Sequence, residues 1–368
     1  MTTGPRLAIF VSFSGSGGVE RMVANLAGGL AALGIAVDLL LARAEGGHLA
    51  AIAPEVRVVP LGVRHTHAAL PALSAYLARE RPAALLAAKD RAIRVAVLAR
   101  RLSRAPLRLV GRLGTTVSAA LQGRSVVTRS LWFLSMRAFY RHVDALVAVS
   151  RGVADDVRAI TRLPPERVLV IRNPVVTPDL ARLAAARVPH PWLAERGIPL
   201  VLGMGRLTRQ KDFPTLLRAF ARVRAERACR LIILGEGRDR AALAALAAAL
   251  GVAADVDLAG FALNPYPYLG ASSLFVLSSL WEGSPNALAE AMALGTPVVA
   301  TDCPSGPREL LEGGRVAPLV PTGDIPALAQ AMLDQLAQPT RAASLREAVR
   351  EYHVEVSARA YARALGLI

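Results

Sequence analysis

Two glutamates, Glu282 and Glu290, flank the start of a predicted helix and could bind hydroxyl groups on either side of a phosphate. An apolar, strand-like run over 273–277 precedes them. Pro285 suits the first helical position and Gly295 suits the left-handed position after the last turn. Free backbone N–H groups and the helix dipole make such an N-terminus a site for an anion. An ordinary surface helix with two exposed acids is equally compatible with this segment alone.

A cationic loop over 203–212 follows the first predicted strand of the second domain. Arg206 and Lys211 lie on this short loop, and both could reach one anion. Paired cations suit a diphosphate, which carries charge on several oxygens. The lysine at position 211 strengthens this interpretation, because Lys89 is the only other lysine among 44 basic residues. A surface loop with two common charges is the alternative, and the nearby glutamates argue against it.

Strand-like and helix-like runs alternate along most of the chain, which predicts parallel sheets covered on both faces. A strand, a glycine loop over 12–18 and a helix open the chain, and this turn could face a phosphate or form a purely structural bend. A proline-rich stretch then interrupts the alternation. We therefore expect a first α/β domain over 1–175, a linker over 176–198, a second over 199–350, and a C-terminal helix over 351–368 that packs back on the first domain.

The chain of 368 residues has a net charge of +16, and nearly all of its basic residues are arginine. Two interpretations of the arginine content are open. One is an arginine-rich coding bias, and the other is a basic face that binds anionic lipid or a phosphate-bearing substrate. Nucleic acid lacks support, because aromatic residues are sparse and no reader motif is present. Cys229 and Cys303 suit neither a disulfide framework nor a metal site. With no signal peptide pattern at the N-terminus, we expect a cytoplasmic protein.

The predicted helix over 125–142 carries four aromatic residues beside four arginines. These residues are Trp132, Phe133, Phe139, Tyr140, Arg124, Arg129, Arg137 and Arg141. Such a helix can lie on the inner face of the cytoplasmic membrane or line a groove for a lipid-linked acceptor. An amphipathic core helix with solvated arginines is the other interpretation.

An ordered set of motifs over nearly the whole chain resembles the retaining GT-B glycosyltransferases of family 4 (glycosyl transferases group 1), of the Glu-x7-Glu type. The matching segments are Gly17-Gly18-Val19-Glu20-Arg21, Val147 to Val153, Ile171 to Val175, Gly205 to Asp212, Leu234 to Gly237 and Glu282 to Glu290. The resemblance implies an α/β fold of two Rossmann-like, doubly wound domains that face a central cleft. Residues 301–309 resemble a subgroup associated with UDP-linked hexoses or N-acetylhexosamines and cell-surface glycan assembly.

The resemblance also implies roles for individual residues. Arg206 and Lys211 would neutralise the leaving diphosphate in place of a metal ion, so no cofactor is expected. Glu282 would hold donor-sugar hydroxyls and complete the catalytic set, and Glu290 would accept hydrogen bonds from the ribose. The remaining residues expected to bind the donor are Gly17, Gly18, Gly235, Phe261, Gly283, Ser284, Pro285, Asn286 and Ala287.

One segment departs from the family pattern, since relatives carry a histidine where this chain has Val110 to Thr116. Arg112 or Thr115 could line the sugar or acceptor side instead, as could Lys89, which follows an earlier strand. His65 and His67 are poor substitutes because they lie in a predicted loop.

The implied function is transfer of a hexose or N-acetylhexosamine from a UDP-linked sugar to a glycan or lipid-linked acceptor. The reaction would proceed through an oxocarbenium-like state with retention of configuration. Two alternatives remain: a non-catalytic glycosyltransferase-like partner protein, which the missing histidine favours, and a nucleotide-sugar epimerase.

Overall fold

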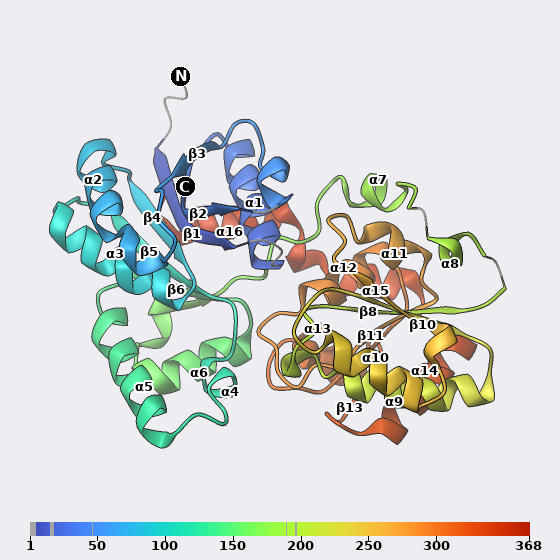
Figure 1. Cartoon of the computed structure of the whole chain (residues 1–368). Helices are drawn as coiled ribbons and strands as arrows, with labels where there is room; N and C mark the ends of the chain where they lie inside the picture. Colours follow the sequence, from blue (N-terminus) through green and yellow to red (C-terminus); the bar gives the residue numbers. More distant parts are fainter. Residues whose placement is uncertain (1–4, 15–17, 46, 189, 196) are drawn as a thin grey trace. The chain divides into compact units, whose positions relative to one another are not determined.

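The structure is a computed structural model that describes residues 5–14, 18–45, 47–188, 190–195 and 197–368. The chain divides into two compact units (Figure 1). The first runs to Val175 and includes Tyr352–Ile368, and the second is Val176–Glu351. The segment 176–198, expected to be a linker, therefore lies with the second unit.

The first unit is built on a seven-stranded sheet in the order β3-β2-β1-β4-β5-β6-β7, with parallel pairing between neighbours. Its strands are β1 (Arg6–Ser14), β2 (Ala36–Glu45), β3 (Arg57–Pro60), β4 (Ala84–Ala88), β5 (Arg108–Leu113), β6 (Ala145–Ala148) and β7 (Val168–Val170). Its α-helices are α1 (Gly18–Ala32), α2 (Leu70–Glu80), α3 (Asp90–Ser103), α4 (Val117–Ala120), α5 (Val126–Tyr140), α6 (Arg151–Thr161) and α16 (Val354–Ala364).

Both faces of this sheet are buried, because successive residues of β1 point to opposite sides. Phe10 packs with Leu73 of α2 and Ile93 of α3, whereas Ile9 packs with Leu26 of α1 on the other face. The near-continuous apolar strands thus follow from a parallel sheet with helices on each side.

The second unit contains a six-stranded parallel sheet in the order β10-β9-β8-β11-β12-β13. Its strands are β8 (Leu200–Met204), β9 (Arg230–Leu234), β10 (Val256–Gly260), β11 (Leu274–Leu277), β12 (Val298–Thr301) and β13 (Leu319–Val320). Its helices are α7 (Leu180–Ala184), α8 (Pro191–Ala194), α9 (Phe213–Glu226), α10 (Arg240–Ala249), α11 (Tyr266–Ala271), α12 (Asn286–Leu294), α13 (Pro307–Leu310), α14 (Ile325–Ala337) and α15 (Ala342–Ala348). The two doubly wound α/β sheets confirm the predicted fold class.

Sequence periodicity missed the shortest elements of the second unit. Strand β13 has two residues, and α11 and α13 have six and four. Elements this short show too few repeats for a period to be read. Among the described residues, none of the helices has the length and apolar character needed to cross a bilayer.

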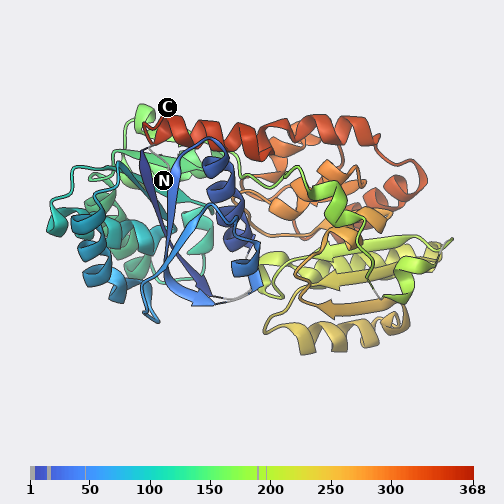
Figure 2. The ribbon, with the colours of Figure 1, turned by 90° about the horizontal axis from the view of Figure 1, so that it is seen from above.

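The last helix, α16, packs against α1 within the first unit (Figure 2). Gly29 makes this close approach possible, because a Cβ atom there would lie 2.5 Å from Val354 Cγ1 and 3.1 Å from Ala358 Cβ. Tyr361 and Ala362 of α16 are fully buried in the same core.

We predict that Gly29→Val lowers the free energy of unfolding by about 1–3 kcal/mol, because the new side chain overpacks the α1–α16 contact. Ala32→Val on the exposed end of α1 is the matched control, and it should stay within about 0.5 kcal/mol of the wild type. Urea unfolding followed by circular dichroism measures both. Equal effects of the two substitutions would show that α16 does not depend on Gly29.

Candidate active site

The candidate site of the second unit lies where the strand order reverses, between β8 and β11. Ligands of doubly wound sheets bind outside the carboxyl ends of the strands at such a switch point. The loop after β8 carries Arg206 and Lys211, and the loop after β11 carries Glu282. Residues 71 positions apart in sequence therefore meet at one edge of the sheet.

Lys211 and Glu282 form a largely buried ion pair. Lys211 Nζ donates a hydrogen bond to Glu282 Oε1 at 2.5 Å, and their side chains are 17% and 8% exposed. Ser279 Oγ donates to the same oxygen at 2.7 Å. Burying a carboxylate is costly unless it is paired and hydrogen bonded, and this geometry satisfies both conditions.

Three further hydrogen bonds join the same two loops. Gln210 Nε2 donates to Trp281 O at 2.9 Å, and Leu280 N donates to Gln210 O at 2.8 Å. Ser278 Oγ donates to Lys211 O at 2.7 Å. The ammonium and the carboxylate are therefore held by fixed backbone rather than by two mobile surface loops.

Gly235 allows the loops after β8 and β9 to approach. A Cβ atom at Gly235 would lie 1.9 Å from Gly205 O, and the residue has φ +142°. Gly205 N donates to Leu234 O at 2.9 Å across the same contact. The absence of a side chain at Gly235 thus serves the approach of the two loops, and its predicted contact with the donor stays a prediction. Phe261, which follows β10, is 44% exposed.

Helix α12 begins at Asn286, so the prediction that Pro285 is the first helical residue is wrong. Pro285 precedes the helix with φ −78° and ψ 88°, and it accepts hydrogen bonds from Leu288 N and Ala289 N. The loop 305–306 packs behind this turn, where Ser305 Oγ donates to Gly283 O. The predicted helix stop at Gly295 is confirmed by its φ of +83°.

The polar side chains around this turn differ in exposure. Glu290 is 1% exposed inside α12, while Asn286 and Ala287 are half-buried. The Ser284 hydroxyl is buried and has no hydrogen-bond partner in the described part of the chain. It can therefore bond to a ligand at no cost to the protein's own contacts.

Cys303 is a buried residue close to the ion pair. Burial, and next to it the nearby Glu282 carboxylate, raise the pKa of the Cys303 thiol to about 12. The thiol stays protonated at neutral pH, which makes it an unreactive packing group.

The sequence indicated Lys211 and Glu282 separately, but it did not indicate the pairing or the groups that support it. Ser279, Gln210 and Thr301 were missed, and Thr301 Oγ1 donates to Ser279 O at 2.6 Å. A serine pair directly after a buried strand was the available signal for Ser279.

The predicted residues of the first unit are spread over its sheet. Gly17 lies outside the described residues, and Gly18 is the exposed first residue of α1. Thr115 is half-buried after β5. Arg112 was expected to line the site, but its side chain is 2% exposed and donates to Asn173 Oδ1 at 2.7 Å. Its contacts are those of a buried structural arginine.

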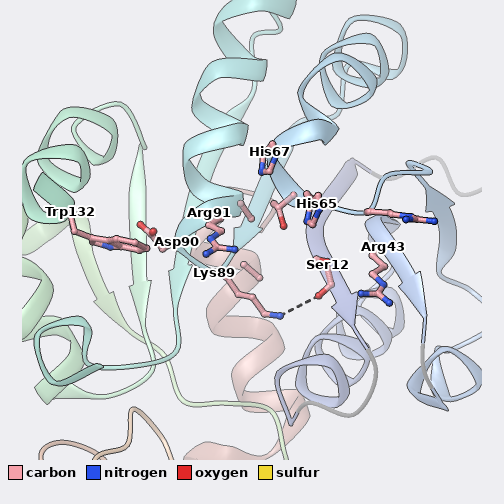
Figure 3. A pocket seen from close by; sticks show the side chains of 12 residues that line it. Ser12, Arg43, His65, His67, Lys89, Asp90, Arg91 and Trp132 are labelled. Atoms are coloured by element: carbon pink, nitrogen blue, oxygen red, sulfur yellow. Dashed lines mark hydrogen bonds between the residues drawn. The ribbon is translucent and has the colours of Figure 1, made fainter. Parts of the chain in front are cut away.

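Lys89 lines a cavity of about 450 Å³ at the carboxyl ends of β1 and β4 (Figure 3). His65 and His67, which were set aside as loop residues, line the same cavity. This point is the switch in the strand order of the first sheet.

Residues 16–179 match the profile described as Glycosyltransferase Family 4, and residues 198–338 match that of Glycosyl transferases group 1. The lipopolysaccharide core biosynthesis glycosyltransferase LpsE of Rhizobium meliloti is 33% identical over 53% of this chain and 54% of its own length. A Campylobacter jejuni N-acetylgalactosamine-N,N'-diacetylbacillosaminyl-diphospho-undecaprenol 4-alpha-N-acetylgalactosaminyltransferase is 32% identical over 46% of this chain and 45% of its own length. The chain thus spans about half the length of these curated relatives.

Solved structures share the fold over the full chain. HepE of Anabaena, crystallised with UDP and glucose, superposes with a TM-score of 0.79 at 18% identity, covering 99% of this chain and 100% of that one. At this identity the likeness concerns the fold alone. With both halves matched by their profiles, the chain belongs to the family 4, group 1 glycosyltransferases, which have the GT-B fold.

Proposed function

We propose that the protein is an active glycosyltransferase that moves a hexose or N-acetylhexosamine from a UDP-linked sugar to a lipid-linked or cell-surface glycan acceptor. The observation that carries this proposal is the Lys211–Glu282 pair at the switch point of the second sheet. A fixed ammonium beside a fixed carboxylate suits a ligand that carries a diphosphate next to sugar hydroxyls.

In this proposal, Lys211 and the exposed Arg206 neutralise the donor diphosphate, and no metal ion is needed. Backbone N–H groups over 283–287 contact the sugar or the distal phosphate, and the Ser284 hydroxyl adds a donor. Glu290 accepts hydrogen bonds from the ribose. A carboxylate as buried as that of Glu290 reaches a ribose only when the side chains around it open.

The proposed reaction retains the configuration at the anomeric carbon. The bond from this carbon to the diphosphate oxygen breaks, and its electron pair leaves with UDP. The acceptor hydroxyl oxygen forms the new bond on the same face, and its proton passes to the departing phosphate oxygen. Glu282 holds the sugar hydroxyls, and the two cations stabilise the negative charge that develops on the diphosphate.

The names of similar proteins support this choice of donor and acceptor. HepE binds UDP and glucose in its crystals, and the Campylobacter relative is named for transfer to a diphospho-undecaprenol-linked acceptor. A non-catalytic partner and a nucleotide-sugar epimerase are the competing functions, and the donor experiment separates all three.

We expect UDP, but not NAD, to raise the melting temperature, and we expect one sugar from a panel of UDP- and GDP-sugars to release nucleoside diphosphate. EDTA should leave the rate unchanged, because Arg206 and Lys211 supply the positive charge. A melting temperature unmoved by any nucleoside diphosphate would contradict the donor site. Conversion of the sugar without release of UDP would identify an epimerase.

Helix α5 presents an apolar row to solvent, which we call the α5 stripe. It consists of Val127, Leu131 and Leu134, which are 68%, 62% and 61% exposed. Spacings of four and three residues place them on one face of the helix. The aromatic residues Trp132, Phe133 and Phe139 instead pack against the core, so the predicted aromatic face is not the exposed one.

We propose that the α5 stripe docks on an anionic membrane surface. Arg124, exposed just before the helix, and Arg141, exposed just after it, supply the complementary charge. Apolar side chains flanked by arginines are the pattern of a helix that lies in the interface.

Vesicles of phosphatidylglycerol and phosphatidylcholine test this surface by cosedimentation. The double variant Leu131→Gln/Leu134→Gln should bind at least about tenfold more weakly, because two leucine side chains leave the lipid. Leu102→Gln on α3, which alters a leucine that is 66% exposed, is the matched control and should bind like the wild type. High salt should also weaken binding. Equal binding of the double variant and the control would exclude the α5 stripe.

A further inference from the structure

The cavity at the carboxyl ends of β1 and β4 is strongly basic, and we call it the basic pocket. Its lining includes Arg43, Arg64, Lys89 and Arg91, together with His65 and His67. These residues come from β2, from the segment that precedes α2, and from the start of α3. A pocket at a switch point is the expected place for a ligand in such a sheet.

Two carboxylates near the basic pocket, Glu45 and Asp90, are each paired with an arginine. Asp90, which lines the pocket, is bonded by Arg94 and accepts a hydrogen bond from Tyr140. Glu45 pairs with Arg43, and the charge of Arg64 also acts on Glu45 to lower its pKa.

Arg91 is exposed and forms no ion pair with any residue that the structure describes. Together with Arg43, Arg64 and Lys89, Arg91 makes the lining of the pocket rich in positive charge, which attracts anions.

Lys89 has a backbone conformation that favours glycine, with φ 89° and ψ 150°. Surrounding contacts hold it there: Lys89 N donates to Arg112 O at 3.1 Å, and Lys89 Nζ donates to Ser12 O at 3.2 Å. Holding a residue other than glycine in such a backbone conformation costs stability. The conformation persists only where the surroundings impose it, which is common at ligand sites. Lys89 and Lys211 are the only lysines in the chain, and each lies at the switch point of its own sheet.

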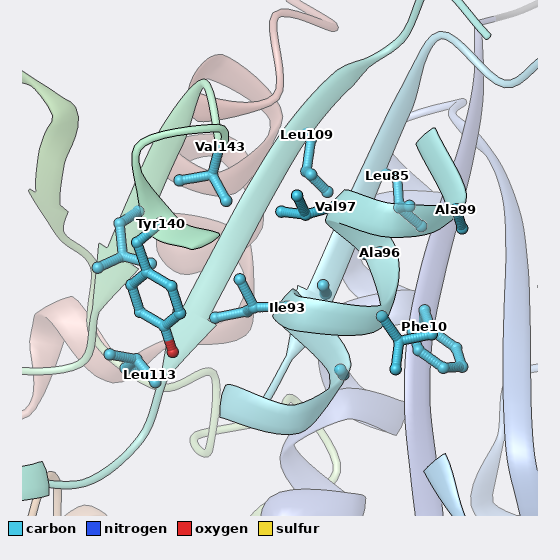
Figure 4. Packing of buried hydrophobic residues seen from close by; sticks show 14 of the residues in the cluster. Phe10, Leu85, Ile93, Ala96, Val97, Ala99, Leu109, Leu113, Tyr140 and Val143 are labelled. Atoms are coloured by element: carbon cyan, nitrogen blue, oxygen red, sulfur yellow. The ribbon is translucent and has the colours of Figure 1, made fainter. Parts of the chain in front are cut away.

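Helix α3 holds its part of the pocket lining in place, because Ile93, Ala96 and Val97 are buried against the sheet (Figure 4). Trp132 of α5 closes one side of the pocket, and its buried Nε1 has no hydrogen-bond partner among the described residues. That indole N–H is a further donor for a ligand oxygen. The volume of about 450 Å³ exceeds what a lone phosphate fills and leaves room for an attached group.

We propose that the basic pocket binds a phosphate or diphosphate group carried by the acceptor. Guanidinium and ammonium groups converging on one cavity suit an anion with several oxygens. The identification of that anion as part of the acceptor rests on the proposed glycosyl transfer. The affinity of the pocket for a phosphate group depends only on the residues that line it.

Inorganic pyrophosphate is the probe, titrated calorimetrically into protein saturated with UDP so that the donor site is filled. The wild type should bind it, and Arg91→Gln and Lys89→Met should each weaken binding at least tenfold. Arg101→Gln removes an exposed arginine from the other end of α3 and should bind within twofold of the wild type. Absence of pyrophosphate binding, or equal affinity in Arg91→Gln and Arg101→Gln, would overturn the proposal.

Lys89→Gly separates a binding role from a structural one. Glycine adopts this φ and ψ without strain, so this variant should melt at or above the wild-type temperature while losing pyrophosphate affinity. A variant that melts lower and binds normally would show that Lys89 serves the fold alone.

Two ligands distinguish the sources of the phosphate. A short prenyl diphosphate that binds more tightly than pyrophosphate identifies a lipid carrier, and glucose 1-phosphate binding more tightly identifies a phosphorylated sugar. Both results support the pocket. If UDP and nucleotide sugars fail to bind, the proposed donor function fails, and the pyrophosphate titration still decides whether the basic pocket holds an anion.

Discussion

The buried ion pair between Lys211 and Glu282 is the interaction on which the second unit's site depends. Neither group is stable alone at this depth, since an unpaired buried charge costs several kcal/mol. The pair therefore ties the loop after β8 to the loop after β11, and Ser279 completes the bonding of the carboxylate. The same geometry that satisfies the free protein places opposite charges side by side for a ligand with both anionic and hydroxyl groups.

The two sheets use their topology in the same way. Each reverses its strand order once, between β1 and β4 in the first unit and between β8 and β11 in the second. Each of the two lysines lies in the segment that follows one of these strands. Divergence of the connections at a switch point leaves space above the strand ends, which side chains from several segments then line. The Lys211–Glu282 pair and the basic pocket thus lie at two separate strand edges.

Most elements could be predicted from the sequence, because buried parallel strands and amphipathic helices leave long repeated patterns. Glu282 and Lys211 could be identified because they lie within motifs of consecutive residues. The basic pocket could not, since Arg43, His65 and Arg91 come from three segments without a shared motif and meet only through the sheet order. The burial of single polar side chains could not be predicted from the sequence either. Arg112 was a candidate to line the sugar or acceptor side, but its side chain is enclosed in the core.

Separate roles for the two partners of the ion pair are the central claim, and the affinity for UDP measured alongside the transfer rate tests them most directly. Lys211→Met should weaken binding of UDP itself by at least tenfold, because we propose that the ammonium contacts the diphosphate. Glu282→Gln should keep UDP affinity within about threefold and lower the transfer rate by about two orders of magnitude, because we propose that the carboxylate contacts the sugar. Melting temperatures of the free variants control for folding. Equal loss of UDP affinity in both variants, or in neither, would contradict this account.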